Sequence, residues 1–363
     1  MYHAHLAAAG ILGALTETAL AMTPALPRHV PIAASFRGGH PENIHHGSFA
    51  VVNAAGELLA RAGDVDTPVF TRSSLKPFQA MPLIARAAER LRLDDADIAL
   101  LCASHNGEPM HTERAAALLA RIGADESALA CGVHEPYVFR FNGLTPPAGA
   151  RYGALHHNCS GKHSGMLLLA DALGAPLQGY LATDHPVQRE IAHCVSHFSG
   201  VPEHALVRGI DGCSAPNIAL PLRSLAHAFA RLTPDTPDSR YGTAPQRIAR
   251  AMSRHPDLVS GRGRNDLHLM QAGRGDWVSK VGADGVQALA SFSRGIAIAA
   301  KCSDGQLAPL MVALVAALEQ LGWLEDTDRE ALARLLPPPL KNAAGVEVGD
   351  MRAVLELKPG TCS

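Results

Sequence analysis

The sequence lacks the excess of positive charge that nucleic-acid-binding proteins carry. Charged residues make up 18% of the 363 residues, and 32 Lys and Arg against 34 Asp and Glu leave a net charge of -2. Domains that bind nucleic acid usually concentrate Lys and Arg on one face or along one helix, whereas here these residues are scattered. We therefore expect no nucleic-acid partner and a small molecule as the ligand.

The sequence also lacks the cysteine pattern of a disulfide framework. Its seven cysteines are widely spaced in a chain too long to need such cross-links. They are Cys102, Cys131, Cys159, Cys194, Cys213, Cys302 and Cys362. We expect a reduced, cytoplasmic setting, in which an isolated cysteine is usually a small buried hydrophobe.

Long apolar runs are missing as well. The run near the N-terminus, from Ala7 to Met22, is interrupted by Glu17 and is too short for a membrane span. No Lys or Arg precedes it and no clear cleavage site follows, so a signal peptide is not indicated. We predict that residues 1–26 are a tail, either disordered or added by an over-extended start, and we expect no membrane partner.

Internal repeats and a domain boundary are absent too, while a hydrophobic content of 47% is ample for a buried core. We expect one catalytic domain over residues 27–363, with a mixed α/β (α+β) fold that begins with antiparallel strands joined by a hairpin-like turn. Strands are predicted at 30–34, 48–52, 58–63, 276–282, 288–292, 296–299 and 353–357. Helices are predicted at 78–93, 110–122, 166–173, 186–198, 218–231, 244–254, 267–272 and 307–321, and a loop at 138–150.

One short stretch carries a pattern typical of nucleophilic catalysis. Ser73 and Lys76 are three residues apart, so at the start of a helix both side chains lie on one face. A serine hydroxyl needs a base to remove its proton, and a lysine can act as that base only as the free amine. The spacing alone leaves a second interpretation open, in which the serine caps a helix and the lysine is solvated.

A lysine base requires an unusual environment. Near neutral pH its pKa must fall by about three units, roughly 4 kcal/mol of bias against the charged form. Burial and a second cation at about 4 Å would supply this bias. We therefore predict a second lysine near Lys76, and Lys280 in a strand-like run is the candidate. Ser104 ends an apolar segment, where a serine either caps a helix or reacts.

A second group of polar residues is a candidate metal site. Cys159 and Lys162 are three residues apart with His163 adjacent, and Asp211 and Cys213 lie in a Gly-Ile-Asp-Gly-Cys turn. Two thiolates and a nitrogen donor can bind zinc tetrahedrally with one position left for water. The spacing is not a standard zinc pattern, so two buried thiols and a lysine facing solvent or substrate remain the alternative.

Taken together, these motifs resemble the asparaginase II family of the Rhizobium etli type (class 3 L-asparaginases). The resemblance extends from about Val30 to about Leu357 in the family's order, and the Asn-Cys-Ser-Gly-Lys-His run is its most specific part. The matching blocks are residues 72–77, 102–108, 158–166, 209–213 and 280–283. The resemblance implies a homodimeric L-asparagine amidohydrolase whose fold, an antiparallel sheet flanked by helices, is similar to serine β-lactamases and glutaminases.

The resemblance also implies roles for individual residues. It implies two Ser-Lys pairs, Ser73 with Lys76 and Ser104 with Lys280, and a zinc ion that orients the substrate rather than attacking it. The implied zinc ligands are Cys159, Lys162 and Cys213. Arg72, His163 and Asp211 are expected to line the substrate site; the fork of Arg72 suits a substrate carboxylate, and His163 could instead orient a metal ligand.

Two positions depart from the family pattern. Ser214 stands where a glycine is expected after Cys213, and Leu267 follows Asp266 where a threonine is usual. The first departure bears on metal affinity and the second on substrate preference.

Three other functions remain alternatives. A β-lactamase or penicillin-binding-type hydrolase would also use Ser-x-x-Lys, but its Lys-Thr-Gly strand motif is absent. A metal-dependent amidohydrolase would use zinc to activate water. A catalytically silent protein would bind zinc or an amino acid without releasing ammonia.

Overall fold

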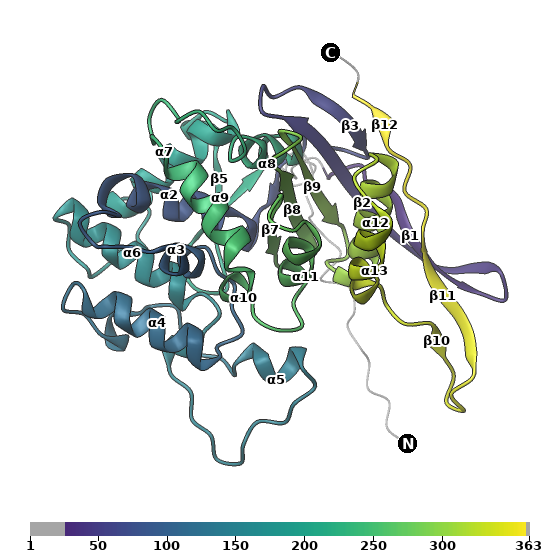
Figure 1. Cartoon of the computed structure of the whole chain (residues 1–363), viewed down its shortest axis with the longest axis horizontal. Helices are drawn as coiled ribbons and strands as arrows, with labels where there is room; N and C mark the ends of the chain where they lie inside the picture. Colours follow the sequence, from purple (N-terminus) through teal and green to yellow (C-terminus); the bar gives the residue numbers. More distant parts are fainter. Residues whose placement is uncertain (1–25, 361–363) are drawn as a thin grey trace, which may run out of the picture.

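The computed structural model describes residues 26–360 and shows a mixed α/β fold around one large antiparallel sheet. The strand order is β10-β11-β1-β2-β9-β8-β7, with β3 pairing with both β2 and β12. The strands are β1 (Val30–Arg37), β2 (His40–Asn53), β3 (Leu58–Ala62), β7 (Trp277–Gly282), β8 (Val286–Ser291), β9 (Ile296–Cys302), β10 (Leu340–Lys341), β11 (Glu347–Ala353) and β12 (Lys358–Pro359). Figure 1 shows the first strands of the chain beside the last ones.

Helices cover both faces of this sheet. The helices are α2 (Lys76–Ala87), α3 (Asp95–Leu101), α4 (Pro109–Ala120), α5 (Tyr137–Phe141), α6 (Ser160–Leu173), α7 (Pro186–Ser199), α8 (Leu222–Ala230), α9 (Ala244–Arg254), α10 (Pro256–Val259), α11 (Asn265–Ala272), α12 (Leu307–Gln320) and α13 (Asp326–Leu332). Helix α8 packs on one face and α12 on the other, and Figure 1 shows most helices gathered on the side of α8.

Strand β2 shows why the sheet has two cores. Ala50 and Val52 point into the core shared with α8, whereas Phe49 and Val51 point into the core shared with α12. Successive side chains of a strand point to opposite faces, so a strand buried on both faces is apolar throughout. This explains why residues 49–52 of β2 are all apolar.

A small second sheet positions the candidate site. It consists of β4 (Val69–Phe70), β5 (Val207–Ile210) and β6 (Pro216–Leu220) in the order β4-β6-β5, and all pairs are antiparallel. The Thr71 backbone N–H and hydroxyl both donate to the Ile218 carbonyl, at 3.1 and 2.7 Å. The Ser73 segment, which follows β4, is thereby held beside the β5–β6 turn.

The structure confirms most of the predicted elements. The helices predicted at 244–254 and 307–321 and the three late strands are present. Within residues 26–360, no helix is both long enough and apolar enough to cross a membrane. The predicted tail lies almost entirely outside the described residues, and the single domain over 27–363 stays a prediction.

Several predicted segments were wrong in type or extent. The helix predicted at 78–93 ends at Ala87, and the strand predicted at 48–52 belongs to β2, which begins at His40. The helix predicted at 218–231 begins only at Leu222, because the preceding apolar residues form β6 and Pro221 separates the two. Short apolar runs fit a strand or a helix equally well. The loop predicted at 138–150 begins with most of α5, the helix predicted at 166–173 begins at Ser160, and the strand predicted at 353–357 ends at Ala353 as part of β11.

Candidate active site

Ser73 lies in a short 3-10 turn, Arg72–Leu75, that leads directly into α2 at Lys76. The Lys76 side chain is 1% exposed, and its Nζ donates to the Ala103 carbonyl at 2.5 Å and to the Ser104 hydroxyl at 2.9 Å. Ser73 itself is only partly buried. The expected pair Ser73 and Lys76 therefore share one turn, but Lys76 is hydrogen-bonded to Ser104.

Ser104 lies between two lysines. It follows α3, and its backbone N–H donates to the Val259 carbonyl at 2.9 Å. Lys280 on β7 is completely buried and donates to the same Ser104 oxygen at 3.0 Å. Lys76 and Lys280 thus lie on either side of one shared hydroxyl, and Lys280 is the second lysine near Lys76.

Both lysines are in surroundings that disfavour their charge. Burial lowers the pKa of Lys280 to about 8; the carboxylate of Asp266 raises it and the ammonium of Lys76 lowers it further. Burial also lowers the pKa of Lys76, the Cys159 thiolate opposes this effect, and the Lys162 ammonium adds to it. A lysine with a lowered pKa is a better base near neutral pH.

The three expected zinc ligands lie together. Cys159 precedes α6, Lys162 lies in its first turn, and Cys213 lies between β5 and β6. The Lys162 Nζ donates to Cys213 Sγ at 2.8 Å. A hydrogen bond from Cys213 holds the pKa of Cys159 well below its ordinary value. Burial lowers the pKa of Lys162, but Cys159, Cys213 and Asp211 together raise it by more, so the net shift of the pKa is upward.

This arrangement fits zinc only in part. Two sulfur atoms and a nitrogen are ligands that zinc accepts, but a lysine coordinates only as the free amine, which its raised pKa opposes. In the part of the chain that the structure describes, no group of three or more His, Cys, Asp or Glu side chains could hold a metal ion. Zinc at this position therefore depends on Lys162 losing its proton.

Arg72 is already engaged by two carboxylates of the chain. Its Nε donates to Asp211 at 2.7 Å, and its Nη1 is paired with Asp284. Its φ of 51° is in the left-handed region, which is unusual for a residue other than glycine and is a feature of strained functional turns. Asp211 thus holds Arg72, and Arg72 would have to leave a carboxylate to bind one on a substrate.

His163 lies in the core behind this cluster. Its Nδ1 is 2.6 Å from the Tyr180 hydroxyl, and its buried Nε2 has no partner among the described residues. Burial holds its pKa well below the ordinary value, so the ring is neutral at neutral pH. His163 does not line the cavity beside Ser73, so the structure places it apart from the expected substrate wall.

A cavity of about 290 Å³ adjoins Ser73. Ser73, Arg72, Asp211, Cys159 and Cys213 line it, whereas Ser104, at 2% exposure, does not. Ser73 is therefore the serine that a small ligand can reach. A larger cavity of about 660 Å³ beside β3 contains none of the predicted catalytic residues.

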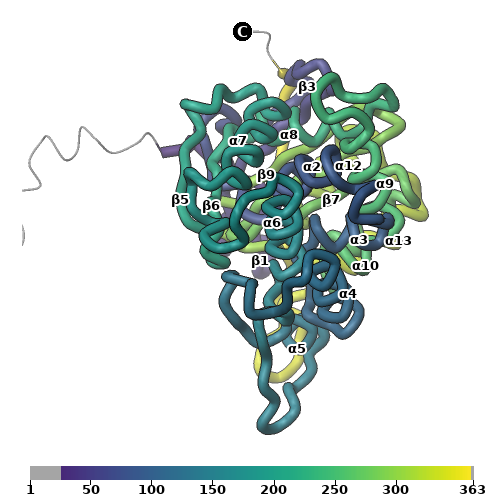
Figure 2. Tube along the Cα trace, turned by 90° about the vertical axis from the view of Figure 1, so that its left-hand side faces the viewer, coloured from purple at the N-terminus to yellow at the C-terminus, as the bar shows by residue number. Residues whose placement is uncertain are grey.

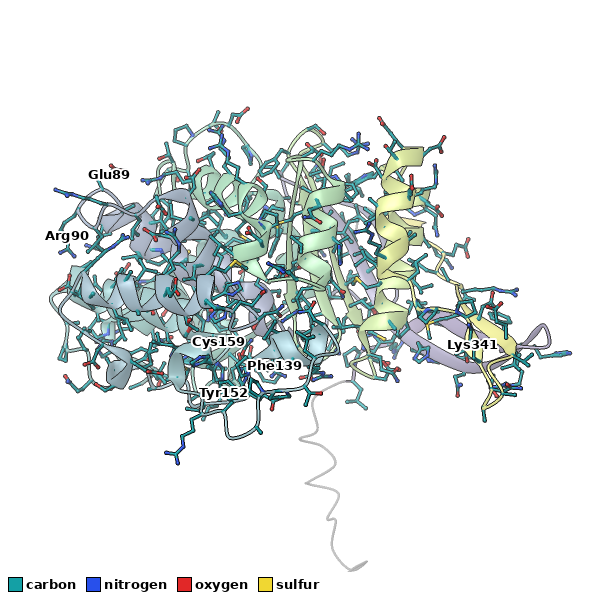
Figure 3. All side chains as sticks on the ribbon, turned by 60° about the horizontal axis from the view of Figure 1, so that its bottom comes forward. Glu89, Arg90, Phe139, Tyr152, Cys159 and Lys341 are labelled. Carbon is teal, nitrogen blue, oxygen red and sulfur yellow. The ribbon has the colours of Figure 1, made fainter. Side chains whose placement is uncertain are left out.

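The outer wall of the cavity was not predicted from the sequence. The His134 ring stacks on the Tyr137 ring with their centroids 4.4 Å apart, and its centroid lies 4.3 Å from that of the His157 ring. All three residues line the cavity. No spacing rule marks such a wall, because it joins a loop, α5 and the segment before α6. Figure 3 shows the labelled Cys159 on this helical side of the molecule, with Lys341 at the opposite end.

The backbone conformation of Ser214 explains why the family pattern has a glycine at this position. Its φ is 65°, and its backbone N–H donates to the Asp211 carbonyl at 2.9 Å to close the turn. Side chains with a Cβ are disfavoured in this left-handed conformation. Glycine would therefore relieve strain next to Cys213.

Replacing Ser214 by glycine is expected to raise the free energy of unfolding by about 0.5–1 kcal/mol, because the relief of left-handed strain exceeds the entropy cost of glycine. Denaturant unfolding measures the change. Ser253→Gly is the matched control, since Ser253 lies in the regular helix α9, where glycine costs about 0.5–1 kcal/mol. Equal losses in both variants would contradict the strain at Ser214.

A serine at a cavity, with buried lysines whose charge is disfavoured, is the arrangement of a hydrolase site rather than of a simple binding pocket. A comparison with protein families identifies the family: the L-asparaginase II model matches residues 33–353, and the chain belongs to this family of amidohydrolases. The resemblance seen in the sequence is thereby confirmed at the level of the family. The Rhizobium etli subtype stays a prediction.

The chain is also similar to solved structures, but no match was found among curated proteins. Mglu in its native form is 14% identical with a TM-score of 0.44, covering 77% of this chain and 66% of Mglu. A β-lactamase from Mycobacterium bovis is 13% identical (TM-score 0.31; 76% of this chain and 94% of that one). A penicillin-binding protein homolog from Caulobacter crescentus is 17% identical (TM-score 0.39; 75% and 92%).

These matches do not bear on the substrate, since every one of these TM-scores is below 0.5. This chain spans just under two thirds of the length of Mglu. The expected fold class, an antiparallel sheet flanked by helices, is confirmed by the strand pairing itself.

Proposed function

We propose that this protein is an L-asparaginase that hydrolyses the side-chain amide of L-asparagine by Ser-Lys nucleophilic catalysis. The observation that carries the proposal is that Ser73 lines the cavity and is followed in the same turn by the buried Lys76. Lys76 and Lys280 both donate a hydrogen bond to the Ser104 hydroxyl. Membership of the L-asparaginase II family supports the choice of an amide substrate.

In the proposed reaction, Lys76 as the free amine takes the proton of Ser73, and Ser73 Oγ attacks the amide carbon. Backbone N–H groups stabilise the tetrahedral oxyanion. Return of the proton to the leaving nitrogen releases ammonia and leaves a β-aspartyl ester on Ser73. Water then cleaves the ester to give aspartate and the free serine, with Ser104 and Lys280 relaying protons to and from Lys76.

The direct test is ammonia release by the purified protein from L-asparagine, with L-glutamine alongside and with and without added zinc. We expect release from asparagine. No release from either amide under any metal condition would overturn the proposal.

The same assay separates the alternative functions. A β-lactamase or penicillin-binding-type enzyme would open a chromogenic β-lactam and release no ammonia from asparagine. A metal-dependent amidohydrolase would lose kcat when zinc is chelated, because its attacking water is bound to the metal. A Ser-Lys enzyme whose zinc only orients the substrate should show a raised KM before kcat falls. A silent binder would take up its ligand stoichiometrically without turnover.

We further propose that Cys159, Lys162 and Cys213 bind zinc beside Ser73. The short contact between Lys162 and Cys213 and the lowered pKa of Cys159 support a site rich in thiolate. Zinc bound there would supply a Lewis acid that orients a polar group of the substrate. The chain's own residues carry out the proton transfers.

Replacing Cys213 by serine is expected to weaken zinc binding by about 100-fold or more, since even outer partners of a metal are worth roughly 10–100-fold. Competition against a chelator of known affinity measures this. Affinity should also rise with pH, because Lys162 must lose a proton to coordinate. Cys194→Ser, which removes a buried thiol on α7, is the control. Equal affinity of both variants would exclude Cys213 as a ligand.

We also propose a homodimer located in the cytoplasm. The six cysteines in residues 26–360 are all free thiols, which agrees with a reducing compartment. The dimer is an expectation from the family alone. Light scattering on the purified protein tests it, and a monomer at micromolar concentration would contradict it.

A further inference from the structure

Asp266 is a completely buried carboxylate in the first turn of α11. Its Oδ1 accepts hydrogen bonds from the Ser279 hydroxyl at 2.9 Å and the Gln287 amide at 3.0 Å. Its Oδ2 accepts from the Val281 backbone N–H at 2.9 Å and from Lys280 Nζ at 3.5 Å. Three of these four donors belong to consecutive residues of β7, so one side chain holds the strand segment that carries Lys280.

The contacts of Lys280 match those of a charged ammonium. Its Nζ has three acceptors: the Ser104 hydroxyl at 3.0 Å, the Val281 carbonyl at 3.0 Å and Asp266. An ammonium has three N–H donors and no lone pair, so each donor of Lys280 is used.

Lys76 differs from Lys280 in its partners. Its Nζ donates to the Ala103 carbonyl and to Ser104 and also lies beside Cys159. No salt bridge joins Lys76 to a carboxylate among the described residues, whereas Lys280 is paired with Asp266. The two lysines that share Ser104 therefore differ in their carboxylate partner.

We propose that Asp266 is the positioning residue that keeps Lys280 charged and aimed at Ser104, so that Lys76 is the lysine that acts as the base. This proposal rests on the Ser-Lys reaction proposed above. Without Asp266, Lys280 would have no carboxylate partner to keep it charged while Lys76 is neutral.

The charged and titratable groups around Lys280 agree with this assignment. They are Asp266, Lys76, Arg264 and, behind Ser104, Cys102. Burial, Lys76 and Arg264 all lower the pKa of Lys280, and Asp266 raises it. Arg264 lies over the Phe141 ring with its carbon 4.2 Å from the centroid. Asp266 is thus the carboxylate that keeps Lys280 protonated at neutral pH.

The test is the pH dependence of ammonia release by Asp266→Asn, Lys280→Met and the double variant. In Asp266→Asn, Lys280 loses its proton at neutral pH and the pKa of Lys76 rises. We therefore expect kcat to fall by at least about 100-fold, KM to stay within roughly threefold, and the acid limb to move to higher pH. The double variant should be no slower than Lys280→Met alone, because both changes remove one function.

Asp97→Asn is the matched control. Asp97 is also a buried carboxylate, 1% exposed, but it pairs with Arg114 at 2.6 Å and Arg121 at 2.7 Å, and neither arginine lines the Ser73 cavity. We expect it to lower the melting temperature and leave the acid limb in place. The proposal is overturned if Asp266→Asn behaves like Asp97→Asn, or if the losses of Asp266→Asn and Lys280→Met multiply in the double variant.

Two further measurements keep the proposal testable. If Asp266→Asn does not fold, the double variant, which leaves no unpaired charge, is compared with Lys280→Met, and a further loss of kcat overturns the proposal. If the wild-type protein releases no ammonia, the proposed function fails, and Asp266 is tested by NMR of labelled lysine. The pKa of Lys280 should then fall by about one unit or more in Asp266→Asn; an unchanged pKa overturns the proposal.

Discussion

Replacing Ser73 by alanine is expected to reduce ammonia release by a factor on the order of 10⁴ or more, because loss of a nucleophile removes the covalent route altogether. Ser73 is the proposed nucleophile because it lines the cavity and lies in the same turn as Lys76. Ser73 is only partly buried, so its replacement by alanine leaves no buried cavity. The melting temperature should therefore stay close to that of the wild type while kcat collapses.

Ser74 provides the matched control, since it is the next residue in the same turn. It is completely buried, and its hydroxyl donates to the Thr71 carbonyl at 2.7 Å. Ser74→Ala should cost about 1 kcal/mol of stability through the lost hydrogen bond and retain most of the rate. A Ser73→Ala variant with near wild-type kcat would reject Ser73 as the nucleophile and leave Ser104, the other serine of the cluster, as the candidate.

The contrast between these neighbours shows what spacing can predict. The spacing of Ser73 and Lys76 was enough to predict one turn, and the pKa argument was enough to require a second lysine. Lys280 meets that requirement at Ser104. The spacing could not show that Lys76 is hydrogen-bonded to Ser104 instead of Ser73, because that contact depends on how α3 packs against α2.

The parts of the site that were missed join segments far apart in the sequence. Asp266 was noted only for the residue after it, although its contacts with β7 make it the counter-charge of Lys280. Asp284 is 212 residues from Arg72, and no local pattern connects them. A buried carboxylate in a sequence looks like any other aspartate until the fold supplies its donors.

The fold was predictable where the local signals agreed. Helix α9 combines a good apolar stripe with a proline in its first turn, and its predicted bounds are those in the structure. The helix predicted at 218–231 includes residues of β6, because the apolar run Ile218, Ala219 and Leu220 fits a strand or a helix equally well. All three are buried, so tertiary burial, which a short sequence window does not encode, decided the conformation.

Replacing Lys280 by methionine is expected to change both limbs of the pH profile. Lys76 must be neutral to act as the base, so activity is lost as pH falls through its pKa. Removing the positive charge of Lys280 takes away a cation that shares Ser104 with Lys76. The pKa of Lys76 should rise by about one to three units, and the acid limb should move to higher pH by the same amount.

The alkaline limb gives a second, independent readout of the same variant. The pKa of Lys280 is about 8, so in the wild type the relay through charged Lys280 should fail as pH rises through that value. Lys280→Met has no such group, and the limb near pH 8 should disappear. The neutral-pH rate should be lower by about 100-fold or more.

Stability and rate must be separated in this experiment. Lys280→Met leaves Asp266 buried without its counter-charge, which costs about 3–5 kcal/mol when one partner of a buried pair is removed. The profile is therefore measured well below the melting temperature of the variant. Lys341→Met, at the opposite end of the molecule from Cys159 (Figure 3), controls for loss of a lysine as such. Figure 2, viewed from the helical side, shows α2, α3 and α6 in front of the sheet. An acid limb that stays in place in Lys280→Met would show that Lys280 is not the cation that keeps Lys76 neutral, and burial together with Lys162 would then have to account for the lowered pKa of Lys76.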